Sequence, residues 1–298
     1  MKKLLFIILI TPAFIIPQSA GNSGLSFLKL GFGARNVAMG DAGNAISEDV
    51  TTLFYNPSKL ALNPKSEIML MHNEWIQDVR SEILGVRSSV FGIPFAFGFN
   101  VTSVSGIEAR TIPGEPESTF DANYFFGSLS TGYKFNEYFS TGFTVKYIYE
   151  GLIADEANGW GFDLGLTYLT PLKGLIASAV IRNLGGMNAL RNEKTTLPTE
   201  LRAGGSYLFD FNDSHFQVVA GTELMTYTST DDIHINVGAE IMYDEVIALR
   251  GGYQSGFESR SLTGGIGVKW GNLKFDYALQ PFTYGLGNAN LFSLQFSF

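Results

Sequence analysis

Residues 291–298 read Leu-Phe-Ser-Leu-Gln-Phe-Ser-Phe, with an apolar side chain at every even position. In an extended strand, successive side chains point to opposite faces of the sheet. The apolar face would therefore carry Phe292, Leu294, Phe296 and Phe298. The opposite face would carry Ser293, Gln295 and Ser297. The segment is predicted to be a β-strand with one apolar side and one polar side.

The composition favours one repetitive β structure across the 298 residues. Glycine (34) and aromatic residues (25 Phe, 13 Tyr, 3 Trp) are abundant, whereas charged residues make up only 16%. Cysteine is absent, so disulfides are not expected to contribute to stability in any compartment.

The N-terminal residues have the pattern of a signal peptide. Lys2 and Lys3 precede an apolar stretch over residues 4–16, and Pro-Gln-Ser-Ala follows at 17–20. We predict a signal peptide over residues 1–20, without lipoprotein acylation because there is no cysteine. Downstream, no apolar run approaches the roughly 18 to 20 residues that a membrane-spanning helix needs. An exported chain of this kind is expected to be either soluble or a β-barrel.

The charge balance argues against nucleic acid as a partner. The formal net charge is −8, and it becomes −10 without Lys2 and Lys3 because 18 basic residues then face 28 acidic ones. An acidic chain repels the phosphate backbone.

Fourteen segments alternate in the same way and are separated by turn-forming residues. The predicted strands cover residues 66–75, 80–90, 95–109, 123–135, 139–152, 159–170, 175–185, 199–209, 215–227, 232–243, 246–254, 261–270, 273–282 and 289–298.

The predicted connections sort by length. Those after even-numbered strands are short: 91–94, 136–138, 171–174, 210–214, 244–245 and 271–272. Those after odd-numbered strands are mostly longer and more polar, including 110–122, 186–198, 228–231 and 282–288. Short turns at one end and long loops at the other are typical of a transmembrane barrel. A soluble β-sandwich or solenoid is the alternative, but it has no reason to sort its loops. We therefore predict an all-β, 14-stranded antiparallel transmembrane barrel over residues 65–298.

Residues 21–64 do not alternate and are rich in glycine and alanine. They contain a set of motif residues: Gly33, Arg35, Met39, Gly40, Asp41, Asn56 and Pro57. This run resembles the opening of the PorV/PorQ family of outer-membrane proteins. More distantly it is similar to the N-terminal hatch of FadL-type transporters. The resemblance extends through residues 197–204, 249–253 and 275–278. It implies a barrel in the bacterial outer membrane, in contact with its lipid, whose residues 21–64 form a hatch inside it.

The PorV/PorQ resemblance implies a role in type IX protein secretion, in which such a barrel binds the translocon barrel or exported proteins. Loops on a rigid scaffold commonly carry recognition. The residues expected to contact partners are Pro113, Glu115, Glu117, Arg191, Glu193 and Lys194.

The FadL resemblance implies an alternative function, the transport of fatty acids or other hydrophobic compounds. Four hatch residues would then line a hydrophobic entry: Leu25, Phe27, Leu28 and Phe32. FadL relatives open the wall at a kink in the third strand, where this chain carries Gly98 and Gly106. Packing room for the hatch is the favoured explanation of these glycines, and a lateral opening is the alternative.

No motif for catalysis, metal binding or a cofactor is recognisable, so an enzyme is not expected. His72, His215 and His234 lack metal-ligand spacing and are interpreted as solvated residues, most readily within the lumen. Inward-facing charges of both signs are predicted to pair in a wet lumen. They are Lys146, Glu150, Asp163, Arg202, Glu223, Glu240, Arg250, Lys269 and Asp276.

Overall fold

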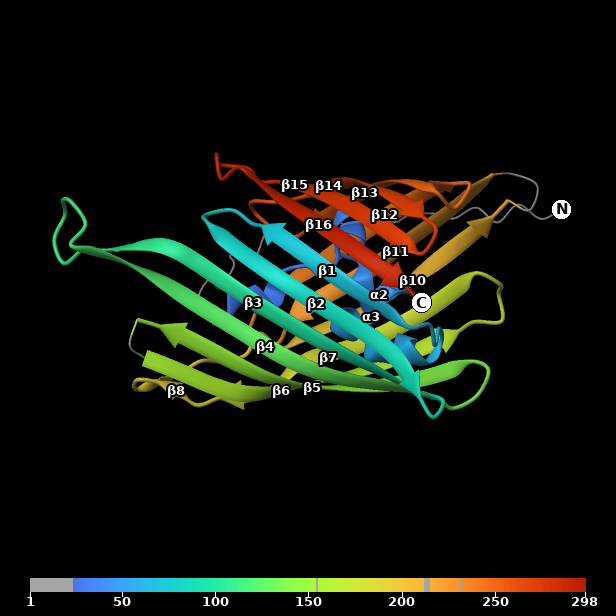
Figure 1. Ribbon diagram of the computed structural model, residues 1–298, viewed down its shortest axis with the longest axis horizontal. Helices are drawn as coiled ribbons and strands as arrows, with labels where there is room; N and C mark the ends of the chain where they lie inside the picture. The colour runs from blue at the N-terminus through green and yellow to red at the C-terminus, as the bar shows by residue number, and fades with distance from the viewer. Residues whose placement is uncertain (1–23, 154, 212–214, 231) are drawn as a thin grey trace.

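Fourteen antiparallel strands close into one barrel in the computed structural model, which describes residues 24–153, 155–211, 215–230 and 232–298 (Figure 1). The predicted signal peptide lies outside these residues. The first seven barrel strands are β1 Glu67–Glu74, β2 Val79–Val90, β3 Ile93–Ala109, β4 Ser118–Lys134, β5 Phe139–Leu152, β6 Asp155–Leu169 and β7 Leu175–Met187. The other seven are β10 Glu200–Asp210, β11 Phe216–Tyr227, β12 Ile233–Tyr243, β13 Ile247–Ser255, β14 Leu262–Trp270, β15 Leu273–Pro281 and β16 Asn288–Ser297.

The C-terminal strand behaves as its alternation predicts. β16 lies between β15 and β1 and closes the barrel. Its even-numbered aromatic and leucine side chains point outward and are exposed. Ser293 and Gln295 point inward and are buried. The apolar side of the sequence is therefore the outer surface of the barrel, and the polar side faces the interior.

The same division holds around the wall. On β12, Ile235 and Val237 are exposed on the outside, whereas Asn236 and Glu240 are buried inside. On β5, Phe143 is exposed and Thr144 next to it is buried. Because the outer face is apolar over most strands and the inner face is largely polar, the barrel is turned inside out relative to a soluble protein.

The predicted sorting of connections is confirmed for most strands, with three corrections. The short turns after β2, β4, β6, β12 and β14 lie at the end of the barrel that also holds Phe298, here called the short-turn end; the opposite end is the long-loop end. At the long-loop end, β5 ends at Leu152 and β6 already begins at Asp155, so this connection is short as well. β4 begins at Ser118, so the predicted loop 110–122 shrinks to 110–117. The cause is a bulge between Val104 and Ile107, beyond which the β3–β4 ladder continues. The predicted loop 186–198 contains a small hairpin, β8 Ala189–Leu190 with β9 Glu193–Lys194.

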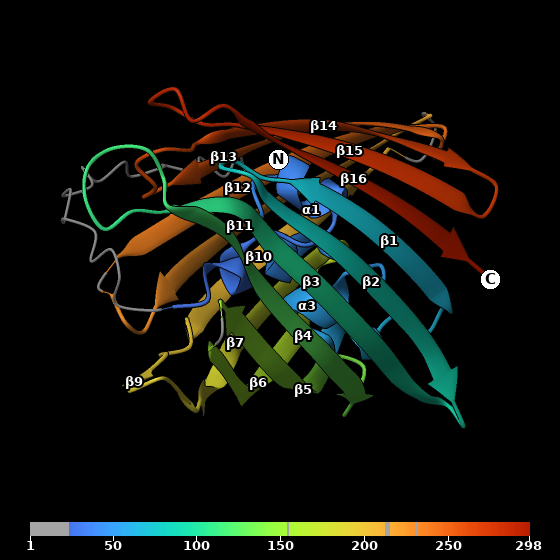
Figure 2. The same ribbon diagram turned by 60° about the vertical axis from the view of Figure 1, so that its left-hand side comes forward.

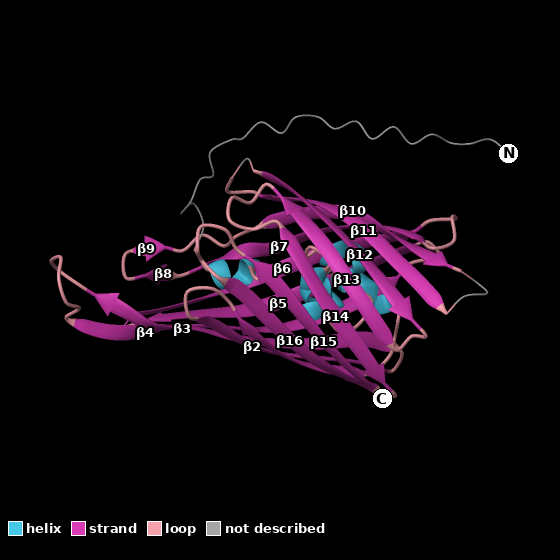
Figure 3. Cartoon of the chain, turned by 90° about the horizontal axis from the view of Figure 1, so that it is seen from above, coloured by secondary structure: helices cyan, strands magenta, loops and turns pink. Residues whose placement is uncertain are grey.

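Residues 24–64, here called the inner segment, lie inside the barrel (Figures 2 and 3). They form five short elements: η1 Ser26–Lys29, α1 Ala34–Ala38, α2 Gly43–Ile46, α3 Thr52–Tyr55 and η2 Pro57–Ala61. α1 contacts β13 to β16, α2 contacts β7, β10 and β11, and η2 contacts β3 to β6. Helices of four or five residues are unstable alone. Their contacts with the wall must therefore stabilise them.

Within the described residues, none of the helices has both the length and the apolar character needed to span a membrane.

Candidate functional site

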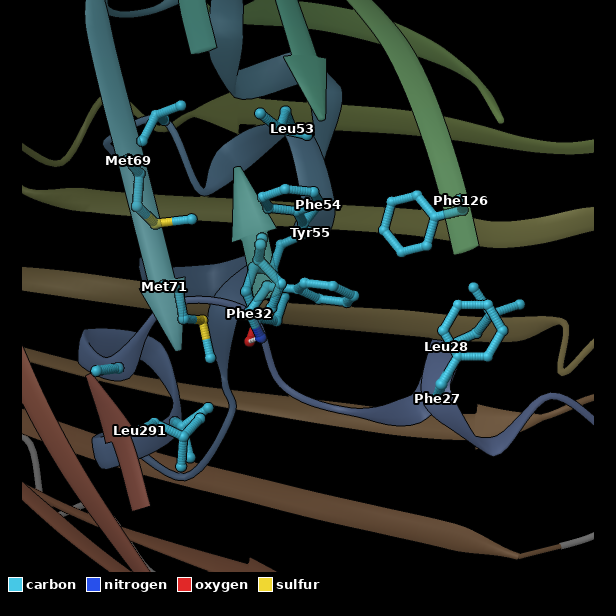
Figure 4. Packing of buried hydrophobic residues seen from close by; sticks show 14 of the residues in the cluster. Phe27, Leu28, Phe32, Leu53, Phe54, Tyr55, Met69, Met71, Phe126 and Leu291 are labelled. Atoms are coloured by element: carbon cyan, nitrogen blue, oxygen red, sulfur yellow. Dashed lines mark hydrogen bonds between the residues drawn. The ribbon is translucent and has the colours of Figure 1, made fainter. Parts of the chain in front are cut away.

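An aromatic cluster occupies part of the barrel interior (Figure 4). Phe32 stacks on Phe54, with 4.7 Å between ring centres, and meets Phe126 edge to face at 5.8 Å. Phe27 stacks on Tyr124 at 5.2 Å. Offset-stacked and edge-to-face arrangements at these distances are favourable for aromatic pairs. The cluster therefore joins residues of the inner segment to inward-facing side chains of β4.

Methionine and leucine side chains extend the aromatic cluster toward the wall. Met69 and Met71 reach it from β1, and Met187 reaches it from β7. Leu197 joins from the connection that precedes β10. Flexible thioether side chains fill irregular space beside aromatic rings. The result is a continuous apolar region within a lumen that is otherwise polar.

The four residues predicted to line a hydrophobic entry belong to this cluster. Leu25, Phe27, Leu28 and Phe32 are all buried, and the structure brings them together. The sequence interpretation missed Phe54, Phe126 and Tyr124. The sequence did contain a signal for Phe126. It lies on the same inward face of β4 as Ser128 and Ser130, where an aromatic side chain stands out among polar ones.

Ion pairs surround the rest of the inner segment. Arg35 lies 2.7 Å from Glu240. Arg250 lies 2.5 Å from Glu240 and 2.8 Å from Asp276, so β12, β13 and β15 share one network of ion pairs with α1. The predicted pairing of inward charges is confirmed here and at Lys146 with Asp163 (2.8 Å). Among the others, Glu150 accepts a hydrogen bond from Thr195, and Lys269 makes an exposed pair with Glu245.

A second polar centre is formed around Asp41. Arg202 of β10 contacts Asp41 at 3.3 Å and Glu223 at 2.9 Å. The Tyr55 hydroxyl donates a hydrogen bond to Asp41 and accepts one from the Phe32 backbone N–H at 2.9 Å. Burial of the hydroxyl and the nearby negative charge of Asp41 raise the pKa of Tyr55 well above its usual value.

The remaining motif residues shape the backbone of the inner segment. Gly33 and Gly40 adopt φ angles of 81° and 72°, which side chains other than glycine rarely tolerate. Met39 is buried in a separate small cluster. The Asn56 side chain accepts a hydrogen bond from Ser58 N–H at 3.0 Å, and Pro57 starts η2. Asn56 therefore caps this helix, as residues of its type commonly do.

Lys59 of η2 is buried and donates hydrogen bonds to the backbone oxygens of Ala45 (2.5 Å) and Ser47 (3.2 Å). Its ammonium thus satisfies carbonyl groups at the C-terminal end of α2. Burial lowers the pKa of Lys59 to about 8; nearby Glu48 and Glu223 oppose this change.

The lowered pKa of Lys59 predicts a pH-dependent stability. Between about pH 8 and 10.5 the unfolded chain binds more protons at this lysine than the folded chain does, so its contribution to folding stability rises with pH. We expect a gain of a few kcal/mol at most, because a tenfold change in proton affinity corresponds to about 1.4 kcal/mol. Urea unfolding at pH 7.5 and at pH 10 should show that the free energy of unfolding increases more with pH in the wild type than in Lys59→Met. An equal increase in both proteins would contradict a lowered pKa for Lys59.

The two candidate kink glycines lie in different settings. Gly98 is in register with Gly85 of β2 and Ser128 of β4, and a Cβ there would meet Leu53 at 2.6 Å. Gly106 has φ 71° and lies at the β3–β4 bulge, beyond Val104, where pairing with β2 ends. The structure therefore places Gly98 against the inner segment and Gly106 outside the closed wall.

The predicted partner residues lie at the long-loop end in two separate loops. Pro113, Glu115 and Glu117 lie in the β3–β4 loop, where Glu117 accepts a hydrogen bond from Thr111. Arg191, Glu193 and Lys194 lie in the β8–β9 hairpin, where Arg191 pairs with Asp155 at 2.5 Å. The β3–β4 hairpin projects far beyond the rest of the barrel (Figure 1).

The interpretation of the histidines as solvated lumen residues is wrong. His234 faces the interior but is buried, and its ring stacks on Phe257 with 4.0 Å between ring centres. His72 points outward beside Glu82, and His215 lies at the short-turn end beside Asp244. Among the described residues, no three His, Asp or Glu side chains are placed to hold a metal ion.

Hollows also lie outside the aromatic cluster. A cavity of about 630 Å³ opens at the short-turn end, and its lining includes the charged residues Asp49, Lys65 and Lys274. A groove of about 730 Å³ crosses the outer wall over β6, β7, β10 and β11, and its lining is mainly apolar.

No protein-family model matches the sequence, and no curated protein matches it. Solved structures do match the fold. The Ralstonia pickettii toluene transporter TbuX is 17% identical, with a TM-score of 0.63 over 90% of this chain and 98% of that one. The Pseudomonas putida toluene transporter TodX is 15% identical, with a TM-score of 0.64 over the same shares. A Pseudomonas aeruginosa FadL homologue is 14% identical, with a TM-score of 0.52 over 89% and 97%. The closed 14-stranded barrel is thus similar in fold to FadL-type outer-membrane barrels.

Proposed function

We propose that this chain is an outer-membrane barrel that transports small hydrophobic molecules, and that the aromatic cluster is their binding site. In this proposal residues 1–20 are a signal peptide, residues 21–64 are a hatch, and residues 65–298 are the barrel. The apolar outer surface suits a lipid environment. The fold likeness to two toluene transporters supports the same function.

The aromatic cluster is the observation that carries the proposal. The interior of a transmembrane barrel is ordinarily polar. Here it contains Phe27, Phe32, Phe54 and Phe126 in mutual contact, next to Tyr124. An apolar region walled by aromatic rings with a few polar groups is the environment that small hydrophobic ligands require.

η1 is the element most suited to move aside for a ligand. It has four residues, and Phe27 and Leu28 fill the part of the cluster nearest the long-loop end. The chain just before it is joined to the barrel by one backbone hydrogen bond, from Gly24 N–H to Thr196 O at 3.1 Å. Elements with few backbone hydrogen bonds open at the least cost.

Uptake of a labelled monoaromatic hydrocarbon by cells or vesicles containing the barrel tests this function. We expect the double variant Phe27→Ala with Tyr124→Ala to take up the hydrocarbon about fivefold more slowly. The reason is that losing one aromatic pair weakens ligand binding by roughly 0.5–1.5 kcal/mol. Phe97→Ala is the matched control, because Phe97 is an aromatic on the outer face of β3. Uptake by the wild-type barrel no faster than by empty vesicles would refute the proposal.

Protein binding in type IX secretion, as in PorV/PorQ proteins, is the second candidate. One observation favours it: β3 and β4 extend beyond β2 and β5 as a separate two-stranded hairpin with exposed Ile112 at its loop. Such a projection suits contact with a translocon barrel or exported proteins. Deleting residues 111–116 should abolish their co-purification from solubilised membranes. Unchanged recovery would remove this candidate.

A further inference from the structure

The amide side chain of Asn73 has no hydrogen-bond partner among the described residues. Asn73 lies near the long-loop end of β1 and is fully buried. Both its oxygen and its nitrogen are shielded from the surface, and neither forms a hydrogen bond there. Removing an amide from water without a compensating hydrogen bond is unfavourable. Such groups are rare in folded proteins, so this side chain needs an explanation.

Other buried asparagines show how these amides are ordinarily satisfied. The Asn183 oxygen accepts a hydrogen bond from the Lys146 ammonium at 2.9 Å. The Asn183 nitrogen donates to the backbone oxygen of Pro198 at 3.2 Å. In the part of the chain that the structure describes, Asn73 is the one buried asparagine or glutamine with neither polar atom bonded.

A chain of hydrogen bonds beside Asn73 leaves part of a second amide unsatisfied. The Thr102 hydroxyl donates to the Asn100 oxygen at 2.8 Å and lies 2.8 Å from the Ser81 hydroxyl. Because a threonine hydroxyl has one hydrogen, Thr102 must accept from Ser81. The Asn100 nitrogen then has no acceptor among the described residues. Ser81 is in register with Asn73, so these four residues form one polar area on β1 to β3, here called the amide patch.

The amide patch borders the aromatic cluster. Met71 and Trp75 lie two residues before and after Asn73, and residues at this spacing share a face of the chain. Met71 belongs to the cluster (Figure 4), and Trp75 packs against it. Asn100 lies one strand away from Phe126 and in register with it. An apolar region thus ends at a wall that offers unused hydrogen-bonding groups.

The inward row that contains Asn73 carries no charge. From β15 to β4 its residues are, in register, Ala278, Leu291, Asn73, Ser81, Thr102 and Tyr124. An anion held there would be buried without a counter-charge. The patch therefore suits a neutral group. A hydroxyl is suited best, because it can donate to an amide oxygen or accept from an amide nitrogen, whereas an ether or carbonyl can only accept.

We propose that Asn73 binds the hydroxyl group of a neutral aromatic ligand whose ring enters the aromatic cluster. This inference rests on the proposed transport function and narrows its substrate class to phenols and aromatic alcohols. The ligand supplies hydrogen-bonding groups that the protein leaves without partners. A site that binds a hydroxyl in this way discriminates against the analogue that lacks it, because the buried polar groups of the site then stay unpaired.

Two matched probes test the proposal on the intact barrel in neutral detergent: 4-methylphenol and 1,4-dimethylbenzene, which differ by a hydroxyl in place of a methyl group. The phenol is uncharged at pH 7.5, since phenolic hydroxyls have a pKa of about 10. Equilibrium dialysis of each radiolabelled compound, corrected for uptake by empty micelles, gives its affinity. We expect the ratio of the phenol affinity to the hydrocarbon affinity to be about tenfold lower in Asn73→Leu than in the wild type.

Asn123→Leu is the matched control, because Asn123 is an exposed asparagine on the outer face of β4. The ratio of affinities should be the same in this variant as in the wild type. An unchanged ratio in Asn73→Leu would overturn this inference, and binding of the hydrocarbon would leave the transport proposal intact. Binding of neither compound by the wild-type barrel would overturn both.

The stability of the ligand-free barrel provides a second readout. Asn73→Leu should resist urea at least as well as the wild type, because an apolar side chain of similar size needs no hydrogen-bond partner. A clear loss of stability in this variant would show that the Asn73 amide is satisfied within the protein. That result would also overturn the inference.

Discussion

The Gly252→Val variant is expected to keep the barrel wall but lose docking of the inner segment. Gly252 of β13 is in register with Gly238 of β12, and both face Met39 and Gly40. A Cβ at Gly252 would lie 2.0 Å from the Gly40 nitrogen and 2.5 Å from the Met39 carbonyl carbon. Backbone atoms cannot move aside as a flexible side chain can. Valine is favourable in a β-strand. The steric clash is therefore expected to displace the inner segment and to leave the strand intact.

Trypsin cleavage at Arg35 provides the measurement, because Arg35 is buried in the wild type. We expect cleavage in Gly252→Val and resistance in the wild type, together with a rise in single-channel conductance as the lumen opens. The neighbouring Gly251→Val is the matched control: Gly251 points outward, and a Cβ there meets nothing within 4 Å. Full protection of Arg35 in Gly252→Val would contradict the docking described here.

Arg202→Met should cause the largest loss of stability among charge substitutions. Arg202 contacts three buried carboxylates: Asp41 at 3.3 Å, Glu200 at 3.2 Å and Glu223 at 2.9 Å. Removing one partner of a buried ion pair leaves an uncompensated charge, which costs roughly 3–5 kcal/mol. The free energy of unfolding from urea titration in lipid vesicles should fall by about that amount.

Lys269→Met is the control for Arg202→Met, because it removes a cation that pairs with Glu245 at 3.4 Å on the exposed surface. Such pairs contribute about 0–1 kcal/mol. Combining Arg202→Met with Glu223→Gln should recover part of the loss, since one unpaired charge disappears. Equal unfolding energies for Arg202→Met and Lys269→Met would show that the buried network does not stabilise the barrel.

The wall could be predicted from the sequence because its signals are local. Alternation of residues such as Leu294 and Gln295 assigns each side chain to a face, and turn residues delimit each strand. The early start of β4 was missed because residues 118–122 follow a stretch rich in proline, glycine and glutamate that resembles a loop. Beyond the β3–β4 bulge the ladder continues, and Asp121 accepts a hydrogen bond from the Gly106 N–H.

The candidate site could be predicted only in part. Phe27 and Phe32 stand out in a segment that does not alternate, but their partners on β4 lie about a hundred residues away. The Ala34 N–H donates to Ser293 across 259 residues, and no local pattern encodes such a contact.

A crystal structure of the barrel grown with a brominated monoaromatic compound would test the central claim most directly, because bromine can be located by its anomalous scattering. The account predicts a bromine peak inside the barrel, in contact with Phe27, Tyr124 and Phe126. A peak confined to the apolar groove on the outer wall, with the interior unchanged, would contradict it.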